Sequence, residues 1–331
     1  MLVSNQHAHA MSLRPLLTLS SWPDLAIEAL LQIGGTVHST AQSIWALPSG
    51  LRGLVRIRWP RIYVKDYFHV WGNQLRDMLK RHVDVVTADL PQPYRGTIQC
   101  ECEIDRRTHK LAFNVSDYPD VIDERCTRES LLTFKFQFRD GGYPERRIVP
   151  GGYLPRSALL YKMLTYLRWS KDHRRPQFDV YGRFGMEFSP GIRGDVLRRM
   201  TEGVLFRFHG GMGRVRYSRY LREVARSRVC LDLPGQGPLC FRLIEYLAVG
   251  SAIVARPHCV VLPGCLVDGV HIAYCRSGSE EMVQRCKSLL DVPGQERAMV
   301  AATRDFFDRY LHRDQLSAYY VNLVLAAAGV S

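Results

Sequence analysis

The sequence lacks any long hydrophobic segment. No apolar run in its 331 residues approaches the ~20 residues that a membrane-spanning helix needs. The first residues, MLVSNQHAHAMSLRPLL, lack the charged and then apolar layout of a signal peptide, and residues 1–10 before Met11 are expected to be a loose end. With 46% hydrophobic and 23% charged residues, the composition is typical of a soluble globular protein, which we expect to stay in the cytosol.

The nine cysteines lack the spacing of a metal site. Their number is odd, and Cys100 and Cys102 are the only two within two residues of each other. No second pair of Cys or His residues follows at a zinc-binding interval. We therefore expect reduced, mostly buried thiols in a reducing compartment.

Lysine is scarce, with 7 residues against 38 arginines, and the basic charge is unevenly distributed. The net charge is +13, and residues 151–228 contain 17 Lys and Arg against only 6 Asp and Glu. Such a cluster suits a partner that carries phosphate: a diphosphate, a nucleic acid or an anionic lipid. A GC-rich genome would explain the preference for arginine equally well, although not its clustering.

The C-terminal half alternates short apolar strands with amphipathic helices. The predicted strands are residues 178–181, 203–208, 228–233, 251–255 and 271–274, and the predicted helices are 217–227, 238–249, 280–290 and much of 296–327. Strands that are separated by helices of this length pair in parallel through right-handed crossovers. This half is therefore predicted to be a doubly wound α/β domain.

The N-terminal half is less regular. The patterns predict helices at 24–33, 70–81 and 158–169, strands at 61–64 and 83–86, a hairpin of 98–104 with 110–115, and alternation over 131–138. A loop rich in glycine and proline, from Gly141 to Pro155, separates the two halves. We predict an N-terminal, acceptor-side domain over residues 1–155 and a C-terminal domain over 156–331 that includes the closing helices.

The most informative segment is LDLPGQGPLCFRLIEYLAVGSAIV, residues 231–254. Here a buried strand leads into a loop containing Gly235 and Gly237, and a helix opens with Pro238-Leu239. Proline fits the first turn of a helix, where its missing N–H is not needed. Glycines let the backbone come close to a ligand, and the free N–H groups of a helix N-terminus favour an anion. The segment therefore predicts a phosphate site.

Two charged residues on this helix have complementary uses. Arg242 and Glu245 are three residues apart and are predicted to lie together on the face opposite the apolar stripe. A guanidinium can pair with a diphosphate, and a carboxylate one turn further can accept hydrogen bonds from the hydroxyls of a ribose. An ordinary surface ion pair is the alternative. The glycine loop, Gly250 at the helix end and the strand after it favour the nucleotide site.

The segment resembles the signature helix of GT-B-fold glycosyltransferases, especially exostosin-like enzymes, over about residues 228–255. Those enzymes contain a glycine loop, Ser-x-Arg, a Glu three residues on, a small-residue turn and an apolar strand. The resemblance implies an α/β protein with two Rossmann-like domains that face a cleft, and a nucleotide-sugar donor bound by the C-terminal one. It implies that Arg242 contacts the donor phosphates and Glu245 the ribose, while Gly235 and Gly237 shape the loop, and it places Cys240 at the family's serine.

Two further basic residues could face the donor. Arg183 follows the strand at 178–181, where it would either reach the donor phosphates or be a solvated loop residue. Lys135 interrupts the row of phenylalanines in residues 131–138 and points away from them. It would either touch phosphate or face water, and we slightly favour water.

An inverting transfer needs a general base for the acceptor hydroxyl. The acidic segment 116–124 follows a predicted strand, and Asp117 is our candidate, with Asp120 as the alternative. Asp117 would equally well cap a short helix. A retaining transfer would need no such base.

The chain has no Asp-x-Asp motif, with which glycosyltransferases of the other main fold bind a divalent ion. We therefore predict metal-independent transfer of a hexose or pentose from a nucleotide-diphosphate sugar, with no tightly bound cofactor, to a small-molecule, glycan or lipid-linked hydroxyl acceptor. One alternative, motivated by the basic stretch 174–228, is a glycosyltransferase that modifies a hydroxylated DNA base. Another is a non-catalytic protein that binds nucleotide sugars.

Overall fold

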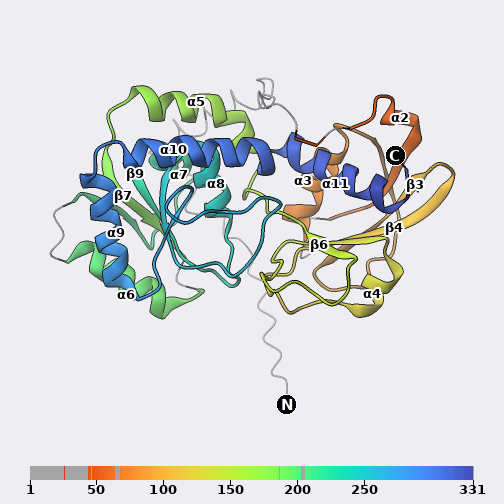
Figure 1. Ribbon diagram of the computed structural model, residues 1–331, viewed down its shortest axis with the longest axis horizontal. Helices are drawn as coiled ribbons and strands as arrows, with labels where there is room; N and C mark the ends of the chain where they lie inside the picture. The colour runs from red at the N-terminus through yellow and green to blue at the C-terminus, as the bar shows by residue number, and fades with distance from the viewer. Residues whose placement is uncertain are drawn as a thin grey trace, which may run out of the picture.

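The computed structural model describes residue 26 and residues 44–45, 47–63, 68–185, 187–202 and 206–330, and structural statements refer to these residues. In chain order its elements are α2 (Leu51–Leu54), β1 (Val55–Pro60), α3 (His69–Leu79), β2 (Asp84–Ala88), β3 (Thr97–Ile104), β4 (Arg107–Asn114), α4 (Glu124–Glu129), β5 (Leu132–Lys135), β6 (Ile148–Pro150), α5 (Leu159–His173), β7 (Phe178–Arg183), α6 (Pro190–Thr201), β8 (Phe208–Gly211), α7 (Tyr217–Ala225), β9 (Ser227–Asp232), α8 (Phe241–Val249), β10 (Ala252–Ala255), β11 (Ala273–Tyr274), α9 (Ser279–Asp291), α10 (Gln295–Phe306), a π-helix (Phe307–Leu311) and α11 (Arg313–Ala327). The strands form two sheets that lie side by side along the molecule (Figure 1), which confirms the predicted α/β class.

The second sheet is fully parallel, in the order β11-β10-β9-β7-β8. Successive residues of its strands point to opposite faces. Cys230 and Ile253 join the apolar cluster that contains residues of α5, α7 and α8, whereas Leu231 and Val254 join the cluster with residues of α6 and α9. Helices therefore cover both faces (Figure 1), and the doubly wound arrangement predicted for this half is confirmed.

The first sheet is mixed, in the order β2-β1-β3-β4-β5-β6. The β1/β2, β4/β5 and β5/β6 pairs are parallel, while β3 pairs antiparallel with both β1 and β4. The predicted hairpin and the strand–helix–strand unit around α3 are confirmed. The strand predicted at 61–64 is wrong for residues 61–63, and residue 64 lies outside the described part. The strand is instead β1 at Val55–Pro60, because Val55, Ile57 and Trp59 alternate into the core.

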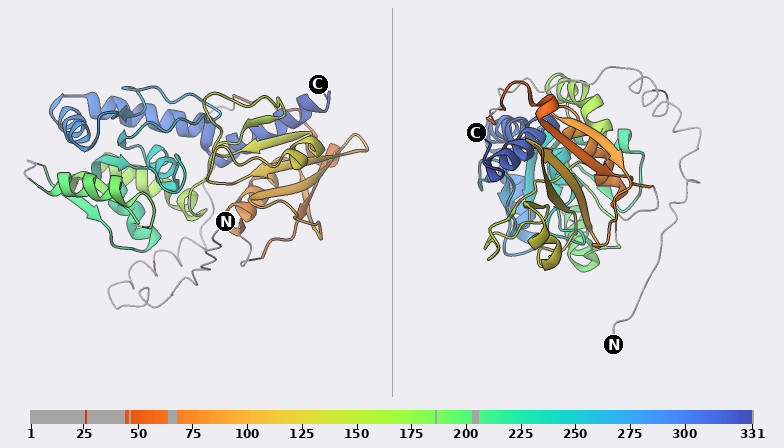
Figure 2. Two further views of the ribbon diagram at one scale, coloured as in Figure 1. Left: turned by 90° about the horizontal axis from the view of Figure 1, so that it is seen from below. Right: turned by 90° about the vertical axis from the view of Figure 1, so that its right-hand side faces the viewer.

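The C-terminal helix α11 crosses to the first sheet and lies beside α3 (Figure 2). Its Tyr320 ring packs at 5.3 Å from Phe113 and at 4.8 Å from Phe134. One apolar cluster therefore continues from the first sheet into the helices over the second. The domain division at residue 155 stays a prediction. The structure shows in addition that α11, from the C-terminal part, packs against the first sheet.

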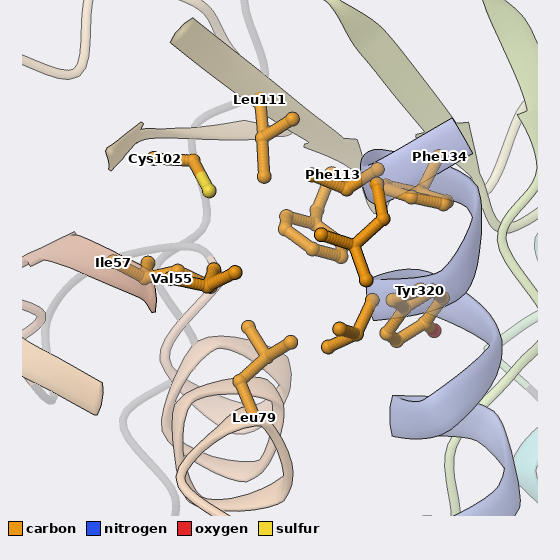
Figure 3. A pocket seen from close by; sticks show the side chains of 11 residues that line it. Val55, Ile57, Leu79, Cys102, Leu111, Phe113, Phe134 and Tyr320 are labelled. Carbon is orange, nitrogen blue, oxygen red and sulfur yellow. The ribbon is translucent and has the colours of Figure 1, made fainter. Parts of the chain in front are cut away.

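An apolar cavity of ≈ 10 Å³ lies in this core between the first sheet, α3 and α11. Figure 3 shows Ile57, Leu79, Phe113 and Tyr320 around it. A space of about this volume holds at most one water, and a water needs polar partners that these side chains do not offer. The cavity is a packing gap and not a ligand site.

Several predicted boundaries differ from the structure. The strand predicted at 203–208 is β8 at Phe208–Gly211, and residues 203–205 lie outside the described part. The helical pattern at 296–327 divides into α10, the π-helix and α11, because the backbone at His312 is extended. Apart from residue 26, the helix predicted at 24–33 lies outside the described residues. Among those described, no helix has the length and apolar character to cross a bilayer.

Candidate functional site

The glycine loop, Pro234–Gly237, connects the carboxyl end of β9 to the segment before α8. The amide of Gly235 donates to the carbonyl of Gly237 at 3.0 Å, and Ser189 Oγ donates to the carbonyl of Gly235 at 2.9 Å. A Cβ at position 235 would lie 2.6 Å from the Cys240 sulfur. The loop is therefore a tight turn in which glycine is required for space.

Helix α8 begins later than predicted. Cys240, with φ −127° and ψ 159°, is still extended, so the first helical residue is Phe241 and Pro238-Leu239 belong to the approach segment. The placement of Pro238 in the first helical turn is thus wrong. Gly250, with φ 85°, ends the helix as predicted.

The N-terminal sheet covers the glycine loop. The side chain of Gln137 exchanges two hydrogen bonds of 3.1 Å with the backbone of Leu239. A Cβ at position 237 would clash with the carbonyl oxygen of Asp117 and with the amide of Gln137. Gly237 is therefore a point of close approach between the two halves of the chain.

Arg242 lies in the first turn of α8, beside the end of β9. One of its Nη atoms donates to the carbonyl of Leu233 at 2.8 Å, and its guanidinium stacks 5.0 Å from the Phe184 ring centre. Its Nε has no hydrogen-bond partner and lies 3.8 Å from a carboxylate oxygen of Asp232. Only 15% of the side chain is exposed. The guanidinium is thus held at the carboxyl end of the sheet, where ligands of doubly wound domains bind.

Arg193 lies on the same side of the loop and was not singled out from the sequence. Although it is only 2% exposed, its Nε donates to the carbonyl of Pro234 at 3.1 Å, and a further nitrogen donates to the carbonyl of Gly185. It stacks 5.8 Å from the Phe184 ring, so two guanidinium groups contact this ring. The only signal for Arg193 in the sequence is its position in the basic stretch 174–228, which does not distinguish it from twelve other arginines there.

Glu245 lies one turn further along α8 but on a buried face. It is 2% exposed, and its Oε1 accepts hydrogen bonds from the Tyr217 hydroxyl at 2.7 Å and the Arg156 amide at 3.1 Å. Burial raises the pKa of this carboxyl. The prediction that Arg242 and Glu245 share a solvent face is wrong, and so is the alternative of a surface ion pair, because each has other partners.

Arg183 is the last residue of β7, as the predicted strand end required. One nitrogen donates to Glu223 at 3.1 Å and another to the carbonyl of Gly213 at 3.0 Å, with 13% of the side chain exposed. The alternative that Arg183 is a solvated loop residue is thus excluded. Its contact with the donor phosphates stays a prediction, and a phosphate would compete with Glu223 for the guanidinium.

The acidic candidates lie in the loop after β4. Asp117 is half-buried, and one of its carboxylate oxygens accepts from the Tyr153 hydroxyl at 3.5 Å. Burial raises the pKa of Asp117, against the opposing effects of Lys135 and Tyr153. Asp120 is exposed and 3.4 Å from Arg139. The helix-capping role considered for Asp117 belongs to Asp123, which accepts from the amide of Cys126.

Lys135 is fully buried, so the prediction that it faces water is wrong. Its Nζ donates to Asn114 Oδ1 at 2.8 Å and to the carbonyls of Ser116 and Tyr118 at 3.2 and 2.8 Å. The alternation of residues 131–138 does not reveal this, because both faces of β5 are buried. Burial lowers the pKa of Lys135 to about 7, although Asp117 and Asp120 oppose the shift.

A buried polar chain that sequence reasoning missed adjoins Arg242. Asp232, at the end of β9, accepts a hydrogen bond from His258 Nε2 at 2.9 Å, and His258 Nδ1 lies 3.1 Å from the Tyr274 hydroxyl. The other carboxylate oxygen of Asp232 is buried without a hydrogen-bond partner. These residues end or follow β9, β10 and β11, so only the order of the strands brings them together.

The family model described as "Glycosyl transferase-like" matches residues 171–318. The match contains the glycine loop, Arg193, Arg242 and Glu245, together with the Asp232–His258 pair. Residues 171–318 form a glycosyl transferase-like domain. No curated protein sequence matches the chain.

The chain is also similar to solved structures at low identity. A glycosyltransferase from Rickettsia africae ESF-5 shares 10% identity over 82% of this chain and 84% of that chain, with a TM-score of 0.44. HepE from Anabaena, in complex with UDP-glucose, shares 14% identity over 60% of this chain and 65% of that chain, with a TM-score of 0.37.

The glycosyl transferase-like domain offers cations and backbone donors in place of clustered metal ligands. Among the described residues, no three His, Cys, Asp or Glu side chains gather closely enough to hold a metal ion. The arginines beside the glycine loop can neutralise an anion directly. Metal-independent transfer stays a prediction.

Proposed function

We propose that the protein transfers a hexose or pentose from a nucleotide-diphosphate sugar to a hydroxyl acceptor, without a metal ion. One observation carries the proposal: two arginines, the buried Arg193 and the largely buried Arg242, lie beside the glycine loop of the glycosyl transferase-like domain. The loop that bears Asp117 packs onto Gly237 from the other half of the chain. A donor bound by Arg193 and Arg242 would present its sugar towards the loop that bears Asp117.

The diphosphate would bind at the N-terminus of α8. Arg193 and Arg242 now donate to backbone carbonyls, which are neutral acceptors. A phosphate oxygen makes a stronger, charge-assisted hydrogen bond with the same nitrogens. The free N–H groups of the first helical turn add to the attraction. Arg183 would join them only by leaving Glu223.

Glu245 would bind the ribose. Its Oε1 now accepts a hydrogen bond from the Tyr217 hydroxyl, and a ribose hydroxyl can replace that donor without leaving the carboxylate unpaired. Burial raises the pKa of Glu245, so its carboxylate becomes protonated at a higher pH than an exposed glutamate would. Donor binding should therefore weaken as this carboxyl becomes protonated.

Asp117 would act as general base in an inverting transfer. Its carboxylate takes the proton of the acceptor hydroxyl, and the freed oxygen forms a bond with the anomeric carbon. The bond from that carbon to the diphosphate oxygen breaks, and the electron pair leaves with the diphosphate. Arg193 and Arg242 stabilise the negative charge that develops there. Asp120, exposed and paired with Arg139, is the weaker candidate.

The ion pairs of the basic stretch make a DNA acceptor less well supported than the number of its arginines suggests. Many arginines of the basic stretch pair with acidic neighbours: Arg183 and Arg219 with Glu223, Arg198 with Asp195 and Glu202, Arg207 with Asp179, Arg214 with Glu187, and Arg228 with Glu296. Paired guanidinium groups contribute less to the counterion release that drives nucleic-acid binding. We therefore propose a small-molecule, glycan or lipid-linked acceptor.

A thermal-shift screen of nucleoside diphosphates and their sugars tests the proposal. The correct donor should raise Tm with concentration as RT ln(1 + [L]/Kd) requires. Arg242→Met and Glu245→Gln should weaken the shift, whereas Arg198→Met, in an exposed ion pair on α6, should not. An undiminished shift in both site variants would refute the donor assignment. Slow hydrolysis of the donor without acceptor would exclude a purely binding protein.

A further inference from the structure

A buried lysine holds the loop that bears Asp117. Lys135 Nζ has three acceptors, and two of them are the carbonyl oxygens of Ser116 and Tyr118, the residues immediately before and after Asp117. The third is Asn114 Oδ1, and the same Asn114 oxygen accepts from the amide of Ser116 at 3.2 Å. One ammonium group therefore holds the carbonyl oxygens of the residues before and after Asp117.

The geometry requires the charged form of Lys135. An ammonium has three N–H donors, which match the three oxygens, whereas a neutral amine would leave one oxygen without a donor. A buried charge is costly unless it is compensated. The carboxylates of Asp117 and Asp120 supply the compensation, since both favour the protonated lysine. The ammonium and the Asp117 carboxylate thus stabilise each other.

The segment that follows β5 also contacts the segment between the glycine loop and α8. Two residues beyond Lys135, Gln137 binds the backbone of Leu239 with both ends of its amide. Lys135 therefore orients the acidic loop, and Gln137 fixes the distance from that loop to the glycine loop.

We propose that Lys135 is a positioning residue: it orients Asp117 towards the glycine loop and keeps its carboxylate ionised. The inference rests on the proposed function, in which Asp117 accepts the proton of the acceptor. Lys135 itself touches neither donor nor acceptor, because it is fully buried and all three of its donors are used.

The groups that face Asp117 come from three segments: Lys135 lies on β5, Tyr153 follows β6, and Cys240 precedes α8. Asp120, on the same loop as Asp117, acts on Lys135. Burial raises the pKa of the Asp117 carboxyl, while the Lys135 charge and the Tyr153 hydrogen bond lower it. Removal of the Lys135 charge should therefore raise that pKa further and shift the acidic limb of the activity profile to higher pH.

The test compares the pH dependence of kcat/KM in the full-length protein and three variants. Lys135→Met removes both charge and donors, and Lys135→Gln keeps N–H donors without the charge. Lys171→Met is the matched control, because Lys171 is a partly buried lysine that also donates to carbonyls, those of Ser227 and Arg228. We expect about a tenfold lower kcat in Lys135→Met, a nearly unchanged donor KM, and an acidic limb shifted upwards in both Lys135 variants.

The outcomes separate this inference from the proposed function. Absence of transfer by the wild type with every nucleotide sugar would refute the proposed function. If Asp117→Asn strongly lowers transfer but the Lys135 variants retain the wild-type acidic limb, only the positioning role is wrong. Lys135→Met should add little to the loss of kcat in Asp117→Asn, and losses that multiply in the double variant would also overturn the positioning role.

If neither Lys135 variant folds, the pH profile of the wild type decides. Transfer must fall as Lys135 loses its proton, and a flat profile from pH 6 to 9 contradicts the inference, since the pKa of Lys135 is about 7.

Discussion

Gln137 and Leu239 exchange two hydrogen bonds, one from the side-chain amide to the carbonyl and one from the backbone amide to the side-chain oxygen, both of 3.1 Å. The first residue follows β5 of the N-terminal sheet, and the second lies between the glycine loop and α8. Both residues are buried. One side chain therefore satisfies both backbone groups of Leu239 and holds the segment after the glycine loop against the N-terminal sheet.

Gln137→Leu should destabilise the protein. An apolar side chain of similar size would leave the N–H and C=O of Leu239 buried without partners, at about 1–3 kcal/mol for each group. We expect a lower free energy of unfolding by about 2–4 kcal/mol in urea titrations. Gln236→Leu is the control, because Gln236 is exposed and makes a single bond of 2.7 Å to the Tyr118 hydroxyl. Equal losses in the two variants would mean that the Leu239 contact has no special weight.

Gly237→Ala should impair transfer more than stability. The new methyl would collide with the carbonyl of Asp117, so one of the two loops must move. Displacement of a base by about 1 Å lowers kcat by about 10²-fold when geometry is limiting. Gly141→Ala provides the control, since a Cβ there meets nothing within 4 Å. Wild-type kcat in Gly237→Ala would show that the contact does not position the site.

Arg193→Met and Arg242→Met should each weaken binding of the nucleoside diphosphate. A charge-assisted hydrogen bond contributes about 1.5–3 kcal/mol, so Kd should rise roughly 10- to 100-fold in calorimetric titrations. Arg242→Lys should recover only part of the affinity, because an ammonium lacks the planar fork of donors and the stacking on Phe184. A Kd within twofold of wild type in either Met variant would remove that arginine from the phosphate site.

The alternation of strands and helices was enough to predict the doubly wound half. Residues of β7, β9 and β10 are apolar on both sides, and Gly250 stops α8 where a left-handed residue is needed. The helix start was misplaced because proline at a first helical turn and proline in an extended approach are indistinguishable from sequence. Only the extended backbone of Cys240 decides between them.

Sequence patterns predict the part of the candidate site whose residues lie in one segment, but not the part that the fold assembles from distant segments. The glycine loop and Arg242 occupy one segment of 24 residues, so their pattern is visible in the sequence. The burial of Lys135 depends on the acidic loop that folds over β5, and the Asp232–His258 pair depends on strand order. Glu245 is buried because α5 and α7 pack beside α8, which no helical periodicity of α8 alone reveals.

His312 should make the stability of the protein depend on pH. It precedes α11 at 2% exposure and accepts from the amide of Asp314 at 3.3 Å, and burial lowers its pKa to about 4. Between that value and about 6.5, the unfolded state binds a proton that the folded state does not, so stability rises with pH across this window and falls as pH decreases through it.

The variant His312→Asn isolates this effect, because asparagine can still accept from the Asp314 amide as a helix cap but does not titrate. The two free energies of unfolding should differ by a constant above pH 7. Below pH 6.5 the wild type should lose up to about 3 kcal/mol more than the variant by pH 4, because burial lowers the pKa of His312 to about 4. Parallel curves for the two proteins, measured by urea denaturation at each pH, would show that His312 is not held neutral in the folded state.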